Sequence, residues 1–194
     1  MPHQGEQTRS LILDVAQEMV QTRGYHAVSF RDIAQKVRIK SASIHYYFPS
    51  KLQLGQAMVR RYRDGFTAGR EAIDRAGGPA MQKLETYVAL LRDGFAQTGR
   101  MCLCGVLASE ASALPPELSQ EVRGFFAENE AWLAGVLAAG RKSGDLKFAG
   151  SPDKNAVALF AGLEGALMTA WTFSDKSRLS FTGQWLVDAL SATK

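Results

Sequence analysis

The sequence predicts an all-α protein: an N-terminal three-helix helix-turn-helix unit, joined by a long helix to a C-terminal helical bundle. Apolar residues recur at three- and four-residue spacing along nearly the whole chain, and alternating strand patterns are almost absent. Glycine, proline and helix-capping signals divide this pattern into segments. The 194 residues, 46% of them apolar and 22% charged, describe a globular protein that can bury a sizeable core.

The first two helices are marked by one apolar stripe each. Residues 12, 15, 16, 19 and 20 form the first stripe, and Gly24 stands where a left-handed terminator is expected, so this helix ends near Arg23. In SFRDIAQKV, Ser29 and Asp32 form a capping pair, while Val28 and Ile33 occupy the positions of a hydrophobic staple. The second helix therefore begins at this serine, and its pattern breaks after residue 37.

A third short helix is predicted from about Lys40 to Phe48. It stops there because Pro49 disfavours helical geometry in the residue before it. Ser50 and Gln53 form another capping pair that opens a long fourth helix, through about residue 75. Beyond the linker at residues 76–80, helical patterns cover approximately 81–97, 101–113, 116–143, 152–174 and 178–192.

Charge is unevenly distributed along the chain. Residues 1–63 carry ten Lys and Arg against four Asp and Glu, a net charge of +6, whereas residues 64–194 have a net charge of −2. A basic first third joined to a nearly neutral remainder suggests that the first part meets a polyanion.

The third helix is amphipathic, with Ile44, Tyr47 and Phe48 on one side. The other side is small and polar, and it is made of Ala42, Ser43, His45 and Tyr46. Two short helices joined by a tight turn form the helix-turn-helix, whose second helix enters the DNA major groove. The alternative is an ordinary solvated face. The surrounding cations and two capped helix N-termini, which suit phosphate oxygens, favour DNA.

Residues 8–54, with "GY" before "SFRDIA" and then "IHYYFPSK", resemble the tetracycline-repressor (TetR) family of transcriptional regulators. The resemblance implies a DNA-binding domain at residues 1–52 and a ligand-binding and dimerisation domain at 53–194. It further implies a sequence-specific repressor that a small-molecule inducer of unknown identity releases from a palindromic double-stranded DNA operator. A cytoplasmic location is expected because no secretory signal pattern is seen. Repression is the commoner behaviour in the family, and activation remains open.

By the same resemblance, the third helix is the recognition helix, and its residues face bases or adjacent phosphates. Arg38 stands where the family commonly has glycine, and Lys40 stands where a small cap such as serine is common, so both cations could add phosphate contacts. The DNA-binding residues expected on these grounds are Ser29, Arg31, Arg38, Lys40, Ser41, Ala42, Ser43, His45, Tyr46, Tyr47 and Lys51.

A palindromic operator requires a two-fold symmetric protein, so a homodimer is expected. Small residues in the last two helical segments would let helices from two chains approach closely, although the same residues could be ordinary core. The expected interface residues are Ala158, Ala161, Gly162, Gly165, Ala166 and Trp185.

The aromatic and apolar residues of the bundle could fill a core, or they could line a small-molecule cavity between helices. The candidate pocket residues are Phe95, Met101, Cys102, Phe125, Trp132 and Trp171. Cys102 and Cys104, the only cysteines, fit neither a disulfide framework nor a zinc site. They are either small buried hydrophobes or, near a helix N-terminus and Arg100, reactive thiols that sense electrophiles or oxidants.

Other classes of protein fit less well. The N-terminus carries no secretory signal pattern, and the apolar stretch at residues 155–174 is interrupted by Glu164, which favours a helix packed against protein over a membrane span. Three scattered histidines, without a phosphate loop, G-x-S-x-G or HExxH, argue against an enzyme, a metal site or a cofactor. A thiol-dependent enzyme and a helical adaptor protein remain as alternatives, and the basic first third argues against both.

Overall fold

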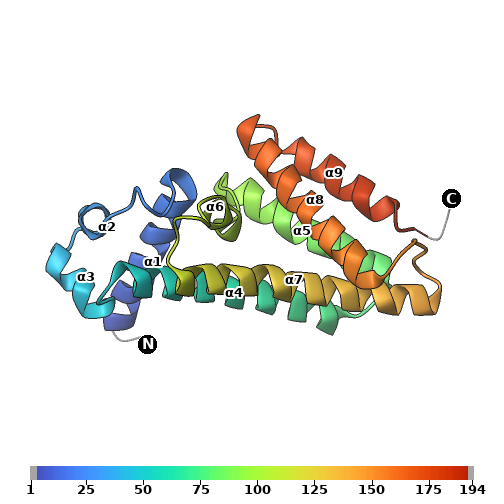
Figure 1. The fold of residues 1–194 in the computed structure, drawn as a ribbon, viewed down its shortest axis with the longest axis horizontal. Coiled ribbons are helices and arrows are strands. Elements are labelled where there is room, and N and C mark those ends of the chain that lie inside the picture. Colours follow the sequence, from blue (N-terminus) through green and yellow to red (C-terminus); the bar gives the residue numbers. More distant parts are fainter. Residues whose placement is uncertain (1–3, 192–194) are drawn as a thin grey trace. The chain divides into compact units, whose positions relative to one another are not determined.

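The computed structural model describes residues 4–191 and confirms the all-α class: within this range no β-strand forms, and residues 146 and 191 make an isolated β-bridge. Figure 1 shows the helices in chain order. Their bounds are α1 Gln4–Arg23, α2 Phe30–Val37, α3 Ser41–Tyr47, α4 Lys51–Ala76, α5 Ala80–Thr98, α6 Leu103–Ser109, α7 Pro116–Ser143, α8 Pro152–Thr172 and α9 Ser177–Asp188.

Most of these bounds lie close to the predicted ones, because the capping signals act as expected. Two helices differ more from their predicted bounds. Helix α9, predicted at 178–192, ends at Asp188, and its predicted last residue lies outside the described residues. Helix α6, predicted at 101–113, begins at Leu103 and ends at Ser109. The chain continues from Glu110 as short turns, in which the N–H of Ala113 donates to the carbonyl of Glu110 over 2.9 Å.

The chain forms two compact units. The first, which we call the head unit, contains the residues up to Asp64 together with Cys102–Gly124. Its core is built from the predicted stripe of α1, the inner faces of α2 and α3, and the first turns of α4. The buried residues that make this core include Ile12, Ala16, Met19, Val20, Ile33, Ala34, Ile44, Phe48, Leu54 and Met58.

The second unit, which we call the bundle unit, contains Gly65–Met101 and the residues from Phe125 onward. Helix α9 packs against α8 and α5. Gly183 makes the approach to α5 possible, because a Cβ at this position would lie 2.5 Å from Val88 Cγ1. Figure 1 shows α8 and α9 side by side. None of the helices in the described range combines the length and hydropathy that crossing a membrane would require.

Candidate nucleic-acid interface

Helix α2 begins with the predicted capping box. The backbone N–H of Asp32 donates to Ser29 Oγ over 3.3 Å, and the backbone N–H of Ser29 donates to Asp32 Oδ2 over 2.9 Å. Hydrogen bonds from the side chain and then the backbone of Ser29 hold the pKa of the Asp32 carboxyl below its usual value. Both predicted staple residues, Val28 and Ile33, are buried.

The turn between α2 and α3 is made by residues that are unusual for the task. Arg38 adopts the left-handed conformation, with φ 62° and ψ 43°, and its N–H donates to the carbonyl of Ala34. Lys40 is the N-cap residue of α3, and no side-chain hydrogen bond caps this helix. The geometry of a glycine turn is therefore reached with an arginine, and α3 begins without a side-chain acceptor.

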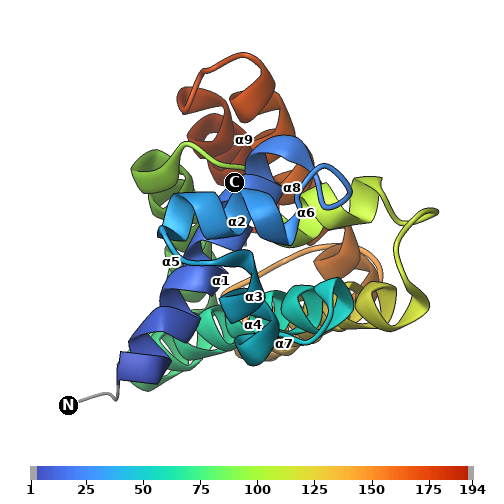
Figure 2. The same ribbon diagram turned by 90° about the vertical axis from the view of Figure 1, so that its left-hand side faces the viewer.

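Helix α3 has the predicted two-sided character, and Figure 2 shows the turn that joins it to α2. Ile44 is 0% exposed and Phe48 is also buried, whereas Tyr46 is 84% exposed and Tyr47 lies between these extremes. The His45 ring is exposed yet contacts the Phe30 ring of α2 edge to face, with 4.7 Å between centroids.

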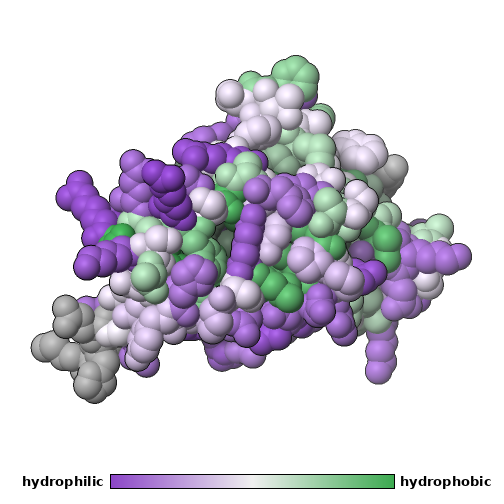
Figure 3. Space-filling model, turned by 60° about the vertical axis from the view of Figure 1, so that its left-hand side comes forward, coloured by the Kyte–Doolittle hydropathy of each residue, from purple (hydrophilic) through white to green (hydrophobic). Residues whose placement is uncertain are grey.

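The remaining candidate DNA-binding residues lie on this helix or flank it in the sequence. Exposed positions are occupied by Ser29, Arg31, Arg38, Lys40, Ser41 and Ala42, whereas Ser43 is partly buried. Figure 3, whose view brings this side forward, shows hydrophilic side chains projecting from it.

Lys51, at the start of α4, is partly buried. Its Nζ lies 4.6 Å from the centroid of the Tyr25 ring and donates to the carbonyl of His26 over 3.3 Å. Burial lowers the pKa of Lys51, and the nearby Glu110 carboxylate opposes this shift.

The candidate pocket residues differ in how far they are buried. Phe95, Met101 and Cys102 are buried, and Phe125 packs against the rings of Phe66, Phe126 and Phe160. Trp171 is largely exposed. Cys104 is buried as well, which favours a packing role for both thiols.

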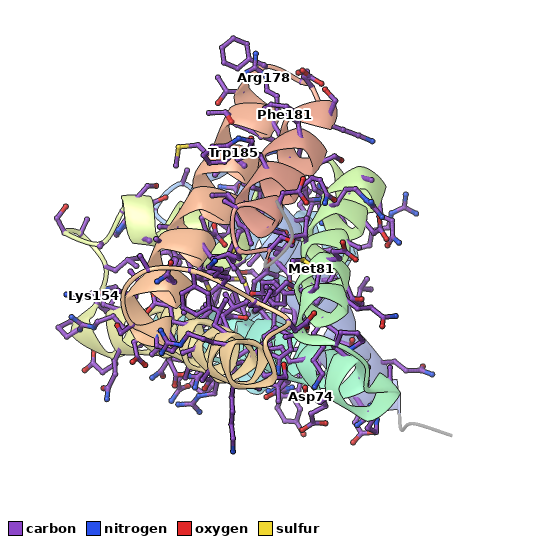
Figure 4. All side chains as sticks on the ribbon, turned by 90° about the vertical axis from the view of Figure 1, so that its right-hand side faces the viewer. Asp74, Met81, Lys154, Arg178, Phe181 and Trp185 are labelled. Atoms are coloured by element: carbon purple, nitrogen blue, oxygen red, sulfur yellow. The ribbon has the colours of Figure 1, made fainter. Side chains whose placement is uncertain are left out.

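Trp132 lines a cleft of about 490 Å³ in the bundle unit, formed by the end of α4, the start of α5 and α7. Asp74, in the last turn of α4 and labelled in Figure 4, accepts hydrogen bonds from Lys83 Nζ over 2.7 Å and from Trp132 Nε1 over 2.8 Å. Sequence reasoning missed this aspartate and this lysine. The signal available was their position on either side of the Gly-Gly-Pro turn.

The candidate dimer residues fall into two groups. Ala158, Ala161 and Gly165 lie on the exposed side of α8, whereas Ala166 is buried and Gly162 faces the Leu186 side chain of α9. Trp185 of α9 is 62% exposed, and large apolar side chains on α8, on α9 and between them are exposed as well. These are Val157, Met168, Trp171, Phe173 and Phe181.

Comparison with protein families identifies two matches. Residues 12–58 match the model of the bacterial regulatory proteins of the tetR family, and residues 80–183 match that of the tetracyclin repressor-like C-terminal domain. The second match alone covers more than half of the chain.

Individual relatives agree with these matches. The chain is 27% identical to the transcriptional regulator AcuR of Cereibacter sphaeroides, over 79% of this chain and 71% of that protein. It is 25% identical to the HTH-type transcriptional regulator RutR of Escherichia coli, over 69% of this chain but only 63% of that protein.

Solved structures with the same fold include a TetR-family transcriptional regulator from Agrobacterium tumefaciens. It is 30% identical, covers 96% of this chain and 98% of its own, and has a TM-score of 0.93. A TetR transcriptional regulator from Legionella pneumophila is 29% identical, covers 98% and 99% of the two chains, and has a TM-score of 0.84.

Proposed function

The chain belongs to the TetR family of DNA-binding transcriptional regulators, and we propose that it is a repressor that holds a palindromic operator as a homodimer until a small molecule releases it. The observation that carries this proposal is the two-sided α3. Ile44 and Phe48 anchor the helix in the head unit, and Tyr46 stands out on the opposite side. Such a helix can enter the major groove without disturbing its own core.

Within this proposal, the side chains of the head unit have two kinds of role. Ser43, His45 and Tyr46 read base edges, because they lie on the outer face of α3. The cations Arg31, Arg38, Lys40 and Lys51, with Tyr47 and the N-terminus of α2 at Ser29, contact phosphates, which sets the register on the duplex without reading sequence. We assign DNA binding to residues 1–52 on this basis.

We assign dimerisation and effector binding to residues 53–194. The exposed apolar side chains of α8 and α9, among them Phe181 and Trp185, support a second copy of the chain as the partner of this face, because isolated monomers rarely expose large apolar patches. Figure 4 shows these two aromatic residues one above the other along α9.

The effector is proposed to bind in the bundle unit, where Trp132 supplies an aromatic wall to the cleft beside Asp74 and Lys83. The six pocket residues expected from the sequence remain the alternative lining. In either case the effector must bind the DNA-incompetent state more tightly than the DNA-bound state. By linkage, the operator then weakens effector binding by the same factor.

The test is selection of genomic DNA fragments by the purified protein, followed by a metabolite screen for release. We expect a fragment with two related half-sites to be retained, and a variant with Ser43→Ala, Tyr46→Ala and Lys51→Ala to lose it. If the unaltered protein retains no fragment at low ionic strength, or the triple variant binds the same fragment equally well, the proposed interface is wrong.

A further inference from the structure

Glu110 connects the end of α6 to a loop of the head unit that lies 85 positions earlier in the chain. Its Oε1 accepts a hydrogen bond from the N–H of Tyr25 over 3.0 Å, and its Oε2 accepts one from the N–H of His26 over 3.4 Å. The His26 Nε2 lies 3.9 Å from the same oxygen. Two successive backbone amides thus enclose one carboxylate, the arrangement known as an anion-binding nest.

The shape of the loop depends on Gly24. This residue ends α1 with φ +84°, and a Cβ built on it would collide with the Glu110 carboxylate. A glycine here both permits the left-handed backbone and leaves room for the carboxylate. The Glu110 side chain can therefore reach this loop only because residue 24 has no side chain.

The loop held by Glu110 leads directly to two proposed phosphate-binding positions. Lys51 donates to the carbonyl of His26, the residue whose amide Glu110 accepts, and its ammonium lies over the ring of Tyr25. The N–H of Val28 donates to the carbonyl of Tyr25 over 3.3 Å, and the next residue, Ser29, caps α2. Glu110 is thus linked to the start of α4 through His26, and to the start of α2 through Tyr25 and Val28.

A carboxylate in this position opposes DNA binding through its charge, because it lies beside a lysine that meets phosphate. We infer that Glu110 is a positioning residue that makes α6 and the Tyr25–His26 loop move together and so sets the placement of Lys51 and Ser29 on DNA. This inference rests on the proposed function and adds how a movement of α6 would change the DNA-binding surface. When α6 withdraws Glu110, the two amides lose their acceptor and Lys51 loses its fixed loop.

The sign of a charge-removing substitution separates positioning from simple electrostatics. Glu110→Ala removes both acceptors, and Glu110→Gln keeps a single carbonyl oxygen. Glu117→Gln is the matched control, because Glu117 is exposed in the first turn of α7 and belongs to the same unit. If only charge matters, all three variants bind the selected operator fragment more tightly than the unaltered protein.

If Glu110 positions the loop, Glu110→Ala weakens operator binding roughly tenfold or more, as loss of hydrogen bonds to a charged group predicts, and Glu110→Gln has a smaller effect. Glu117→Gln binds at least as tightly as the unaltered protein. Amide hydrogen exchange at Tyr25 and His26 accelerates in both Glu110 variants. Retained protection of the Ile33 and Ala34 amides in α2 shows that the head unit is still folded.

A double-mutant cycle with Lys51→Met tests whether Glu110 acts through this lysine. We expect the effect of Glu110→Ala to shrink by most of its size in the Lys51→Met background, because both residues then act on DNA binding through the same loop. Additive effects, or Glu110 variants that bind like Glu117→Gln, overturn the inference while leaving the proposed function intact. Failure of the unaltered protein to retain any genomic fragment overturns the proposed function itself.

Discussion

Arg38 adopts a backbone conformation that L-residues rarely adopt, and within the described residues Ser174 is the other non-glycine residue with a positive φ. An L-residue in the left-handed conformation brings its Cβ close to the following carbonyl oxygen, which glycine avoids. The strain at φ 62° is retained in a turn that carries a cation beside α3. In the proposed function, the phosphate contact of this arginine offsets the strain.

Arg38→Gly is therefore expected to stabilise the folded protein by about 1 kcal/mol and to weaken DNA binding at the same time. Urea unfolding measures the first effect. Salt titration of DNA binding measures the second, and the slope should decrease by roughly 0.9 for one lost phosphate contact. Arg38→Ala is the control, because it removes the same charge but keeps a Cβ in the strained conformation. Equal stability of the two variants would show that the backbone is not strained here.

Tyr46 should affect recognition without affecting stability. Its side chain is almost fully exposed, and its ring packs edge to face on Tyr47, with 5.2 Å between ring centroids. We expect Tyr46→Ala to change the free energy of unfolding by less than about 0.5 kcal/mol. The preference among operator variants should change by about 1–3 kcal/mol at one base position. Competition binding against single-base operator variants measures this, and a uniform loss on all sequences would assign Tyr46 to phosphate instead.

At the scale of the helical elements, a buried polar set joins α4, α5 and α7 in the bundle unit. Asn129 Oδ1 accepts from Arg70 over 2.7 Å and from the Tyr87 hydroxyl over 2.8 Å, while its Nδ2 donates to the carbonyl of Phe125 over 2.7 Å. All three side chains of the set are buried. A charge buried in this way is tolerated only while its hydrogen-bond partners stay in place.

Asn129→Ala is expected to destabilise the protein by about 3–5 kcal/mol, because a buried guanidinium loses its main acceptor. Tyr87→Phe removes one donor and leaves the arginine contact intact, so about 0.5–1.5 kcal/mol is expected. Urea unfolding of the two variants checks this order. The triple variant Arg70→Met, Tyr87→Phe and Asn129→Leu should recover much of the loss. If Asn129→Ala and Tyr87→Phe lower the free energy of unfolding by similar amounts, the main role of Asn129 is not to stabilise the buried charge of Arg70.

Asp74 links the same three helices through its bonds to Lys83 and Trp132, and these bonds make stability depend on pH. The hydrogen bond from Lys83, followed by that from Trp132, holds the pKa of the Asp74 carboxyl below its ordinary value. A carboxyl with a lower pKa in the folded than in the unfolded state stabilises the fold above the unfolded pKa. This contribution is lost as the pH falls through the folded value.

Asp74→Asn should therefore be less stable than the unaltered protein at neutral pH, and the difference should shrink between neutral pH and about pH 3. Urea unfolding at several pH values measures this difference. In a Lys83→Met background the pH dependence attributable to Asp74 should become smaller, because the largest cause of the shift is gone. A difference that stays constant with pH would mean that the carboxylate charge contributes nothing.

At the scale of the whole molecule, the sequence predicts what is encoded locally. The starts of α2 and α4 follow from Ser29 and Ser50, whose hydroxyl oxygens accept the amides expected of caps. The inner and outer faces of α3 follow from helical periodicity, because Ile44 and Tyr46 differ by two positions and so point to nearly opposite sides.

Features that depend on contacts between distant segments could not be predicted. Helix α6 ends at Ser109, and the carboxylate of the next residue, Glu110, accepts hydrogen bonds from amides in the loop after α1. Because this loop is far away in the sequence, the residues around position 110 do not predict the contact. The aromatic residues of the bundle likewise occur in similar helical patterns, so the sequence does not show which of them lie in the core and which line a cleft. Phe125 is surrounded by other rings, while Trp132 borders an open cleft. Periodicity assigns a residue to a face, but packing decides whether that face meets a side chain or a cleft.

The proposed function requires the chain to assemble as a dimer, because a two-fold operator is bound by two copies. Phe181 is 73% exposed and Trp185 is 62% exposed, and both lie on α9 about one turn apart. If this face meets a second copy of the chain, Phe181→Glu and Trp185→Glu each cost about 2 kcal/mol or more of dimerisation free energy, as buried aromatic anchors do. Sedimentation equilibrium should then show monomers at concentrations where the unaltered protein is dimeric, and operator affinity should fall because each half-site is bound independently. Gln97→Glu adds the same charge at an exposed position of α5 and should leave both measurements unchanged. A dimer that persists in both aromatic variants would place the interface elsewhere on the bundle unit.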